Sequence, residues 1–187
     1  VRVLSSQAAN AYVSEQIVKW QDAYKGADAL AIAPYFGMNV GPGTNPSQSQ
    51  VEGWTVDQVL DHLQNVAQPE VAQWMREQKT VADKYGLKLI CYEAGQHAVG
   101  IQGGENSQTL TNLFHAANRH QRMGQLYRLY MDEWEKVTGG TPMAMFASNG
   151  LWSKWGSWGL GEYYDSTPAQ YPKLKAVLDR IRVPKTE

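Results

Sequence analysis

The chain alternates short apolar runs with longer segments in which apolar residues recur at helical spacing. Four runs have the composition of buried strands, and they cover residues 1–6, 28–36, 87–92 and 143–147. Amphipathic helices are predicted between and after them, over residues 13–25, 55–85, 109–137 and 171–181. Strand followed by helix, repeated four times, is typical of a parallel sheet with helical crossovers. The sequence therefore predicts an α/β protein.

Local signals support the ends of these helices. Thr55 and Gln58 form a capping-box pattern, and Pro69 stands where a first helical turn could begin again. The pair Gly139-Gly140 ends the longest helical stretch, which is expected to run unbroken from about residue 109 to residue 137.

Three turn-rich segments follow strands and precede helices. They cover residues 37–53, 95–107 and 149–165 and are rich in Gly, Ser, Asn and Gln. In a parallel sheet such connections share the carboxyl edge of the strands, where ligands commonly bind. We expect the first of them to be a mobile loop on that face.

Composition narrows the class of partner. Seventeen basic and eighteen acidic residues give a net charge of -1, so nothing attracts nucleic acid or an acidic membrane surface. No apolar run has the length of a membrane span, and no basic-then-apolar leader opens the chain. The 187 residues suffice for a single domain with its own core, although a strand beginning at Val1 indicates a truncated chain. Cys91, the only cysteine, is expected to be a small buried side chain.

Cofactor and metal signatures are missing from the sequence. The first strand lacks a following G-x-G-x-x-G, and no G-x-S-x-G nucleophile elbow occurs. The four histidines show none of the short spacings of zinc sites. We therefore expect neither a cofactor nor a metal.

Glu93 is the most informative residue, because a lone carboxylate ends the apolar run 87–92 where the chain turns into a loop. An ionisable group at the carboxyl end of a buried strand must find a partner or point into a cleft. It is therefore a candidate catalytic group. The alternative is a structural glutamate that caps the turn at Gly95 or pairs with an arginine.

Other candidates lie at neighbouring strand ends and in the last loop. Trp152, Trp155 and Trp158 occupy a Gly/Ser/Lys segment and favour stacking on a pyranose ring, although a hydrophobic plug is an alternative for each. His97 could bind substrate hydroxyls or cap its loop. Ser6 and Asn149 are short polar groups suited to lining a cleft, and Asn149 could instead form a turn.

These motifs resemble the second half of a (β/α)8-barrel glycoside hydrolase of the large retaining superfamily that includes cellulases. The resemblance rests on Tyr35 in Ala31-Ile-Ala-Pro-Tyr-Phe-Gly37, on Glu93, and on Trp152 in Ala147-Ser-Asn-Gly-Leu-Trp152. Counted as strands five to eight of the barrel, the four strands place Tyr35 as the residue that supports the nucleophile, Glu93 as the nucleophile and Trp152 as the floor of a sugar subsite. A tyrosine hydroxyl that donates to a carboxylate stabilises its ionised form and fixes its rotamer. The resemblance also implies a carbohydrate ligand and an extracellular or periplasmic location.

The chain departs from that family in one respect. The family's acid/base glutamate, preceded by Asn at the end of strand four, would lie upstream of Val1. Retaining hydrolysis needs two carboxyl groups about 5–5.5 Å apart. Loop carboxylates that could substitute are Glu52, Glu105, Glu162 and Asp165.

The missing group leaves alternatives open. The chain could be a catalytic (βα)4 half barrel, or a carbohydrate-binding or scaffold half barrel without catalysis. A sugar isomerase or aldolase would need a metal cluster or a buried Schiff-base lysine, and the strand ends offer neither. A half barrel has two unpaired edges, so we expect closure into eight strands by a homodimer or by the missing N-terminal half.

Overall fold

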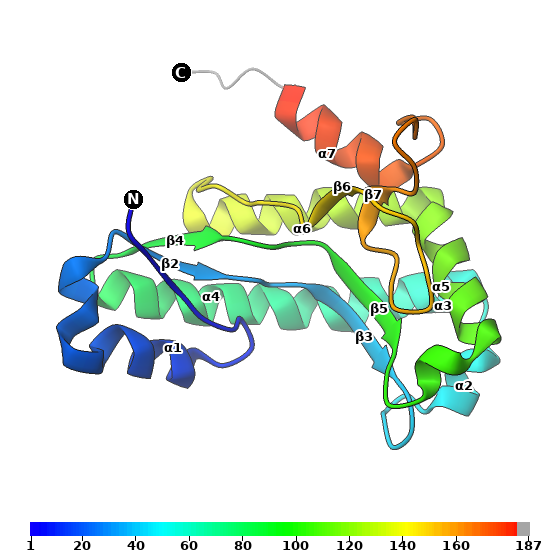
Figure 1. Cartoon of the computed structure of the whole chain (residues 1–187), viewed down its shortest axis with the longest axis horizontal. Helices are drawn as coiled ribbons and strands as arrows, with labels where there is room; N and C mark the ends of the chain where they lie inside the picture. The colour runs from blue at the N-terminus through cyan, green and yellow to red at the C-terminus, as the bar shows by residue number, and fades with distance from the viewer. Residues whose placement is uncertain (183–187) are drawn as a thin grey trace. The chain divides into compact units, whose positions relative to one another are not determined.

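The computed structural model describes residues 1–182, and these divide into two compact units (Figure 1). Unit one contains Val1–Tyr35, Gln68–Gly95 and Tyr130–Phe146. Unit two contains Phe36–Ala67, Gln96–Leu129 and the described residues from Ala147 onward. Both units combine helices with parallel strand pairs, which confirms the predicted α/β class.

Unit one is built on a three-stranded parallel sheet. Its strands are β1 (Val3–Ser5), β2 (Ala29–Ile32) and β4 (Lys88–Cys91), in the order β1-β2-β4. All four residues of β2 are buried, as expected for a central strand. Beyond β4, Cys91 makes one isolated parallel bridge to Met143 in place of a fourth full strand. The sheets of the described residues are small and separate, and none closes into a barrel.

Helices of unit one pack on this sheet. Helix α1 (Ala11–Lys19) begins where the Asn10 side chain accepts from the Val13 amide, and a 3-10 segment, η1 (Trp20–Gly26), follows it. Helix α4 (Gln68–Lys84) packs against β2, β4 and α1. Helix α6 (Gln121–Thr138) contributes its residues from Tyr130 onward to unit one. Cys91 is buried, as expected, and burial raises the pKa of its thiol to about 12.

Unit two contains two further strand pairs. Strand β3 (Phe36–Val40) runs parallel to β5 (Gln96–Gly100), and β6 (Ala147–Asn149) runs parallel to β7 (Gly159–Gly161). Its helices are α2 (Gln48–Glu52), α3 (Val56–His62), the π-helix η2 (Leu63–Ala67), the 3-10 turn η3 (Gly104–Asn106), α5 (Gln108–Arg119), the first half of α6, and α7 (Pro172–Arg182).

All three segments expected to be loops contain regular structure, so that prediction was wrong. Residues 37–53 contain most of β3 and helix α2, residues 95–107 contain β5 and η3, and residues 149–165 contain β7. The strands form because Met38, Val40 and Ala98 are buried, while Gly37 lets the two backbones approach. A Cβ on Gly37 would lie 2.1 Å from the His97 carbonyl oxygen, so only glycine permits this pairing.

Helix boundaries were predicted well in one place and poorly in another. The capping box of Thr55 and Gln58 is present with both of its hydrogen bonds, which confirms that prediction. The prediction of a single helix over residues 109–137 was wrong, because α5 ends at Arg119 and the next residue, His120, has an extended ψ of 142°. The end at Gly139-Gly140 is confirmed, and both glycines have positive φ.

Candidate functional site

Tyr35 and Glu93 are the candidate catalytic residues that the structure brings together. Tyr35 follows β2 and Glu93 follows β4, and these are adjacent parallel strands of unit one. The tyrosine hydroxyl donates to Glu93 Oε2 at 3.1 Å, and both side chains are half-buried. The pair therefore stands at the carboxyl edge of the sheet, with one oxygen of the carboxylate held in a fixed direction.

Neighbouring contacts fix the backbone on both sides of this pair. Tyr130 of α6 donates its hydroxyl to the Pro34 carbonyl at 2.6 Å, one residue before Tyr35. The Cys91 thiol donates to the Glu93 carbonyl at 2.9 Å. Phe146 lies edge-on to the Tyr35 ring with centroids 6.4 Å apart. The packing of unit one therefore holds Tyr35 and Glu93 in this arrangement.

Neither structural alternative for Glu93 is present. Among residues 1–182, its carboxylate forms no ion pair with an arginine or lysine and does not cap the Gly95 turn. Its side-chain hydrogen bond is the one from Tyr35. A carboxylate without a structural charge partner at a strand end is the feature that a functional role would require.

Ser6 has a structural contact in unit one. Its side chain is buried, and Ser14 of α1 donates its hydroxyl to the Ser6 hydroxyl oxygen at 2.7 Å. The Ser6 amide donates to the Ala31 carbonyl. Ser6 therefore joins the end of β1 to a helix.

Trp152 lies in the core of unit two. Only 4% of it is exposed, and its indole nitrogen donates to the Gly159 carbonyl at 3.0 Å. Arg119 and Lys173 approach its ring to 4.9 and 4.5 Å from the centroid. The faces of the indole are thus covered by protein, and in this structure they are not available to a sugar.

Trp155 and His97 differ in how much of each side chain is exposed. Trp155 is 62% exposed, and the Lys154 ammonium lies 4.6 Å from its ring centroid. His97 of β5 is partly buried and lies edge-on to Trp158, with centroids 4.9 Å apart. Burial lowers the pKa of His97, which favours a neutral ring at neutral pH.

Asn149 ends β6 and is exposed, where the Ser148 hydroxyl donates to its side-chain oxygen. It is therefore a solvent-facing amide that could act as a donor or an acceptor to a ligand.

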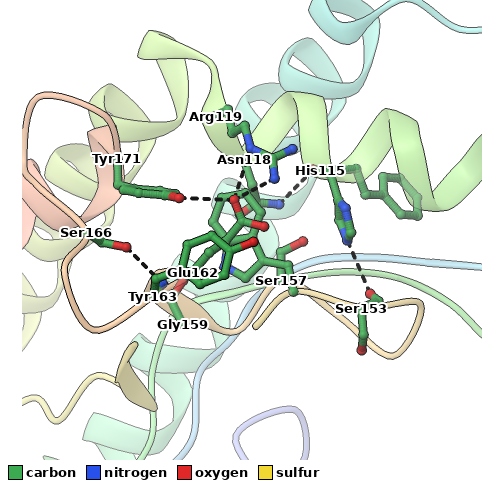
Figure 2. A network of polar contacts seen from close by, with 12 residues as sticks. His115, Asn118, Arg119, Ser153, Ser157, Gly159, Glu162, Tyr163, Ser166 and Tyr171 are labelled. Atoms are coloured by element: carbon green, nitrogen blue, oxygen red, sulfur yellow. Dashed lines mark hydrogen bonds and ion pairs between the residues drawn. The ribbon is translucent and has the colours of Figure 1, made fainter. Parts of the chain in front are cut away.

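The sequence analysis did not identify a polar network in unit two that reaches from the exposed Arg119 to the buried Glu162 (Figure 2). Arg119 of α5 donates twice to Glu162 Oε2, and the Tyr171 hydroxyl donates to the same oxygen at 3.2 Å. Beside them, Lys173 of α7 is fully buried and donates to Asn118 Oδ1 at 3.0 Å and to the Ser157 carbonyl. Burial lowers the pKa of Lys173 well below its ordinary value.

One signal in the sequence could have revealed this lysine. Lys173, Ala176, Val177 and Arg180 follow the spacing of one helical face, and the two apolar members of that set are buried. A lysine at the start of a buried stripe is a candidate for a buried amine.

Unit two also encloses a small cavity of about 10 Å³. Its lining includes Val99, Leu110, Phe114, His115, Ser153 and Ser157. The Ser157 hydroxyl is buried and has no hydrogen-bond partner among residues 1–182. This space is about that of one water molecule and is too small for a sugar ring.

Two kinds of feature are absent from residues 1–182. No helix there combines the length and apolar character needed to cross a bilayer. Nor do three His, Cys, Asp or Glu side chains of that range gather as metal ligands would. Comparisons with protein-family models, with curated proteins and with solved structures found no match to this chain.

Proposed function

We propose that this chain is a glycoside hydrolase-like half barrel in which Glu93 is the nucleophilic carboxylate and Tyr35 orients it. The observation that carries the proposal is the 3.1 Å hydrogen bond from the Tyr35 hydroxyl to Glu93 Oε2 at the ends of adjacent parallel strands. Ligands of parallel α/β proteins bind at that edge. Glu93 has no charge partner among the described residues, and this supports the same conclusion.

The chemistry assigned to the pair is attack on an anomeric carbon. The Glu93 oxygen that does not accept from Tyr35 is free to approach the sugar, while the tyrosine holds the other oxygen in place. Such fixed orientation lowers the barrier by removing rotational freedom before reaction. A covalent glycosyl-enzyme follows, which water later hydrolyses.

The loop carboxylates of residues 1–182 do not supply an evident acid/base group. Glu162 is held by Arg119 and Tyr171 in unit two. Glu52 accepts hydrogen bonds from Gln48 and Ser107, and the Gly103 amide donates to Glu105. These three carboxylates already have structural partners. Asp165 is exposed and lies in unit two, whereas Glu93 lies in unit one. The proposal therefore takes the acid from another polypeptide segment or a second copy.

The half barrel is part of the same proposal. The sheet of unit one supports it through its parallel order β1-β2-β4 and the bridge from Cys91 to Met143, which together give four parallel positions. Strand β1 pairs on one side only, and its Val3 side chain is exposed. A homodimer, or a further polypeptide segment that supplies the other strands, would cover both edges. Analytical ultracentrifugation tests the homodimer, and a soluble monomer at micromolar concentration would count against it.

An activated substrate tests the catalytic role without the acid. A 2,4-dinitrophenyl glycoside has a leaving group that departs without protonation, so the glycosylation step needs only the nucleophile. We expect a burst of dinitrophenolate from one member of a panel of glucosides, xylosides, mannosides and cellobiosides. Glu93→Gln should abolish the burst. Tyr35→Phe should slow it roughly 10- to 100-fold, the range for a lost hydrogen bond to a charged group.

A second candidate function is carbohydrate binding without catalysis. The observation that favours it is the exposed indole of Trp155, together with the structural hydrogen bonds that already engage Glu52 and Glu105. In that case oligosaccharides change the tryptophan fluorescence, Glu93→Gln binds as well as the natural chain, and no dinitrophenolate burst occurs.

A further inference from the structure

The segment from Trp152 to Glu162 is fixed by three buried anchors that leave other aromatic residues near the surface. Trp152 is held by its bond to Gly159, Glu162 by Arg119 and Tyr171, and Ser157 by its carbonyl group. Between these anchors lie the exposed Trp155 and the half-buried Trp158. Buried polar contacts therefore hold this segment in one conformation.

The Ser157 carbonyl receives two buried donors from different elements. Lys173 Nζ donates to it from α7, and Gln96 Nε2 donates to it from β5 at 3.0 Å. Gln96 is itself held, because its side-chain oxygen accepts from the Ala98 amide and its own amide donates to the Tyr127 hydroxyl oxygen. The carbonyl before Trp158 is thus clamped between a strand and a helix.

Burying a lysine at this position carries a large desolvation free energy. Its amino group is fully buried, and its compensating contacts are the Ser157 carbonyl, Asn118 Oδ1 and the Trp152 ring at 4.5 Å. An apolar side chain of similar volume would avoid the cost of removing an amine from water. It would also leave the Ser157 carbonyl with a single donor. Holding that carbonyl is what the lysine does that an apolar residue cannot.

Fixing the Ser157 carbonyl also restricts the next residue, Trp158. Trp158 follows Ser157 directly and lies edge-on to His97, which in turn follows Gln96 directly. The two clamping contacts therefore set the distance between the tryptophan and histidine rings.

We propose that Lys173 and Gln96 are positioning residues that fix Trp158 against His97 and hold the turn at Trp155–Trp158 as a preformed surface for stacking on a saccharide. The saccharide part rests on the proposed function, whereas the positioning part concerns this chain alone. A preformed surface binds more tightly because its ordering cost is met before the ligand arrives.

The test compares Lys173→Met with Lys175→Met. The first keeps an apolar stem and removes the donor, and the second removes an amine from the exposed side of the same helix, where Lys175 is 52% exposed. Circular dichroism first establishes whether both variants fold. Hydrogen exchange over residues 153–158 and the NMR signals of the His97 ring then report the clamp without any ligand.

In Lys173→Met we expect faster exchange over residues 153–158 and displaced His97 signals, with both unchanged in Lys175→Met. Affinity for the saccharide that the natural chain binds should fall roughly tenfold, which corresponds to about 1.4 kcal/mol. Unchanged exchange and unchanged His97 signals in a folded Lys173→Met would overturn the positioning role, whatever happens to thermal stability.

Two further outcomes are also decisive. If Lys173→Met does not fold, Gln96→Met removes the other donor, and unaltered His97 signals in that variant would overturn the clamp. If the clamp signals change but the natural chain binds none of glucose, xylose, mannose and cellobiose, the sugars of the glycoside panel, the positioning role stands, and the stacking surface and the proposed carbohydrate function both fail.

Discussion

Replacing Trp152 by alanine should be far more damaging than replacing Trp155, although both lie in the same aromatic segment. Trp152 is 4% exposed and donates to the Gly159 carbonyl, whereas Trp155 is 62% exposed. A buried aromatic side chain removes about 150–250 Å² from water, worth roughly 4–6 kcal/mol at about 25 cal/mol per Å². Measured losses for such truncations are about 3–5 kcal/mol.

The surroundings of Trp152 add to this loss. Its removal leaves the Gly159 carbonyl without that donor and takes the ring away from the Lys173 amino group. We therefore expect Trp152→Ala to lower the free energy of unfolding by about 3–5 kcal/mol, and Tm by about 6–20 °C for a chain of this size. Trp155→Ala should stay within about 0.5 kcal/mol of the natural chain, as exposed substitutions do.

Urea unfolding followed by circular dichroism measures both variants, and saccharide titration of the folded proteins completes the comparison. Trp155→Ala should lose affinity while it keeps stability. A Trp152→Ala protein as stable as the natural chain would refute the reasoning, because it would mean that the indole lies at the surface and is free to serve as a platform.

Three other predictions concern particular contacts. Tyr130→Phe removes the 2.6 Å bond to the Pro34 carbonyl and should lower the free energy of unfolding by about 1–3 kcal/mol in urea titrations, whereas a loss below about 0.5 kcal/mol would show that the carbonyl finds another donor. Gly37→Ala brings a Cβ against the His97 carbonyl and should cost about 1–3 kcal/mol or more, and an unaltered Tm would contradict the close pairing of β3 and β5. Burial lowers the pKa of His97, so the unfolded chain takes up the proton first as pH falls; the natural chain should lose stability below about pH 6.5, and His97→Gln should flatten this part of the curve measured by thermal melts.

Much of unit one could be predicted because its strands carry the simplest signal. The strands at Val3–Ser5, Ala29–Ile32 and Lys88–Cys91 are short apolar runs between helical patterns, and a buried parallel strand has that appearance. The meeting of Tyr35 and Glu93 follows from the same logic, since adjacent parallel strands end at one edge.

Unit two was harder to predict because its strands depend on close approach between backbones. Strands β3 and β5 contain Gly37 and Gly100, and glycine in a polar context is more often a sign of a loop. Trp152 is covered by Arg119 and Lys173, which lie on helices that are distant from it in the sequence. The pattern of a single segment carries no information on such partners.

Lys173 illustrates the remaining limit. Lysine is usually a surface residue. The burial of Lys173 is tolerated only because Asn118, Ser157 and the Trp152 ring all contact its amino group. That convergence arises from packing and not from the sequence of α7 (Pro172–Arg182).

Covalent trapping tests the central claim most directly. A 2-deoxy-2-fluoro glycoside with a dinitrophenyl leaving group forms a glycosyl-enzyme that is hydrolysed slowly, so the label can be located by mass spectrometry of peptides. The account predicts one adduct per chain, on the peptide that contains Glu93, and none in Glu93→Gln. An adduct on a different carboxylate, or no adduct with any sugar of the panel, would contradict the assignment of Glu93 as the nucleophile.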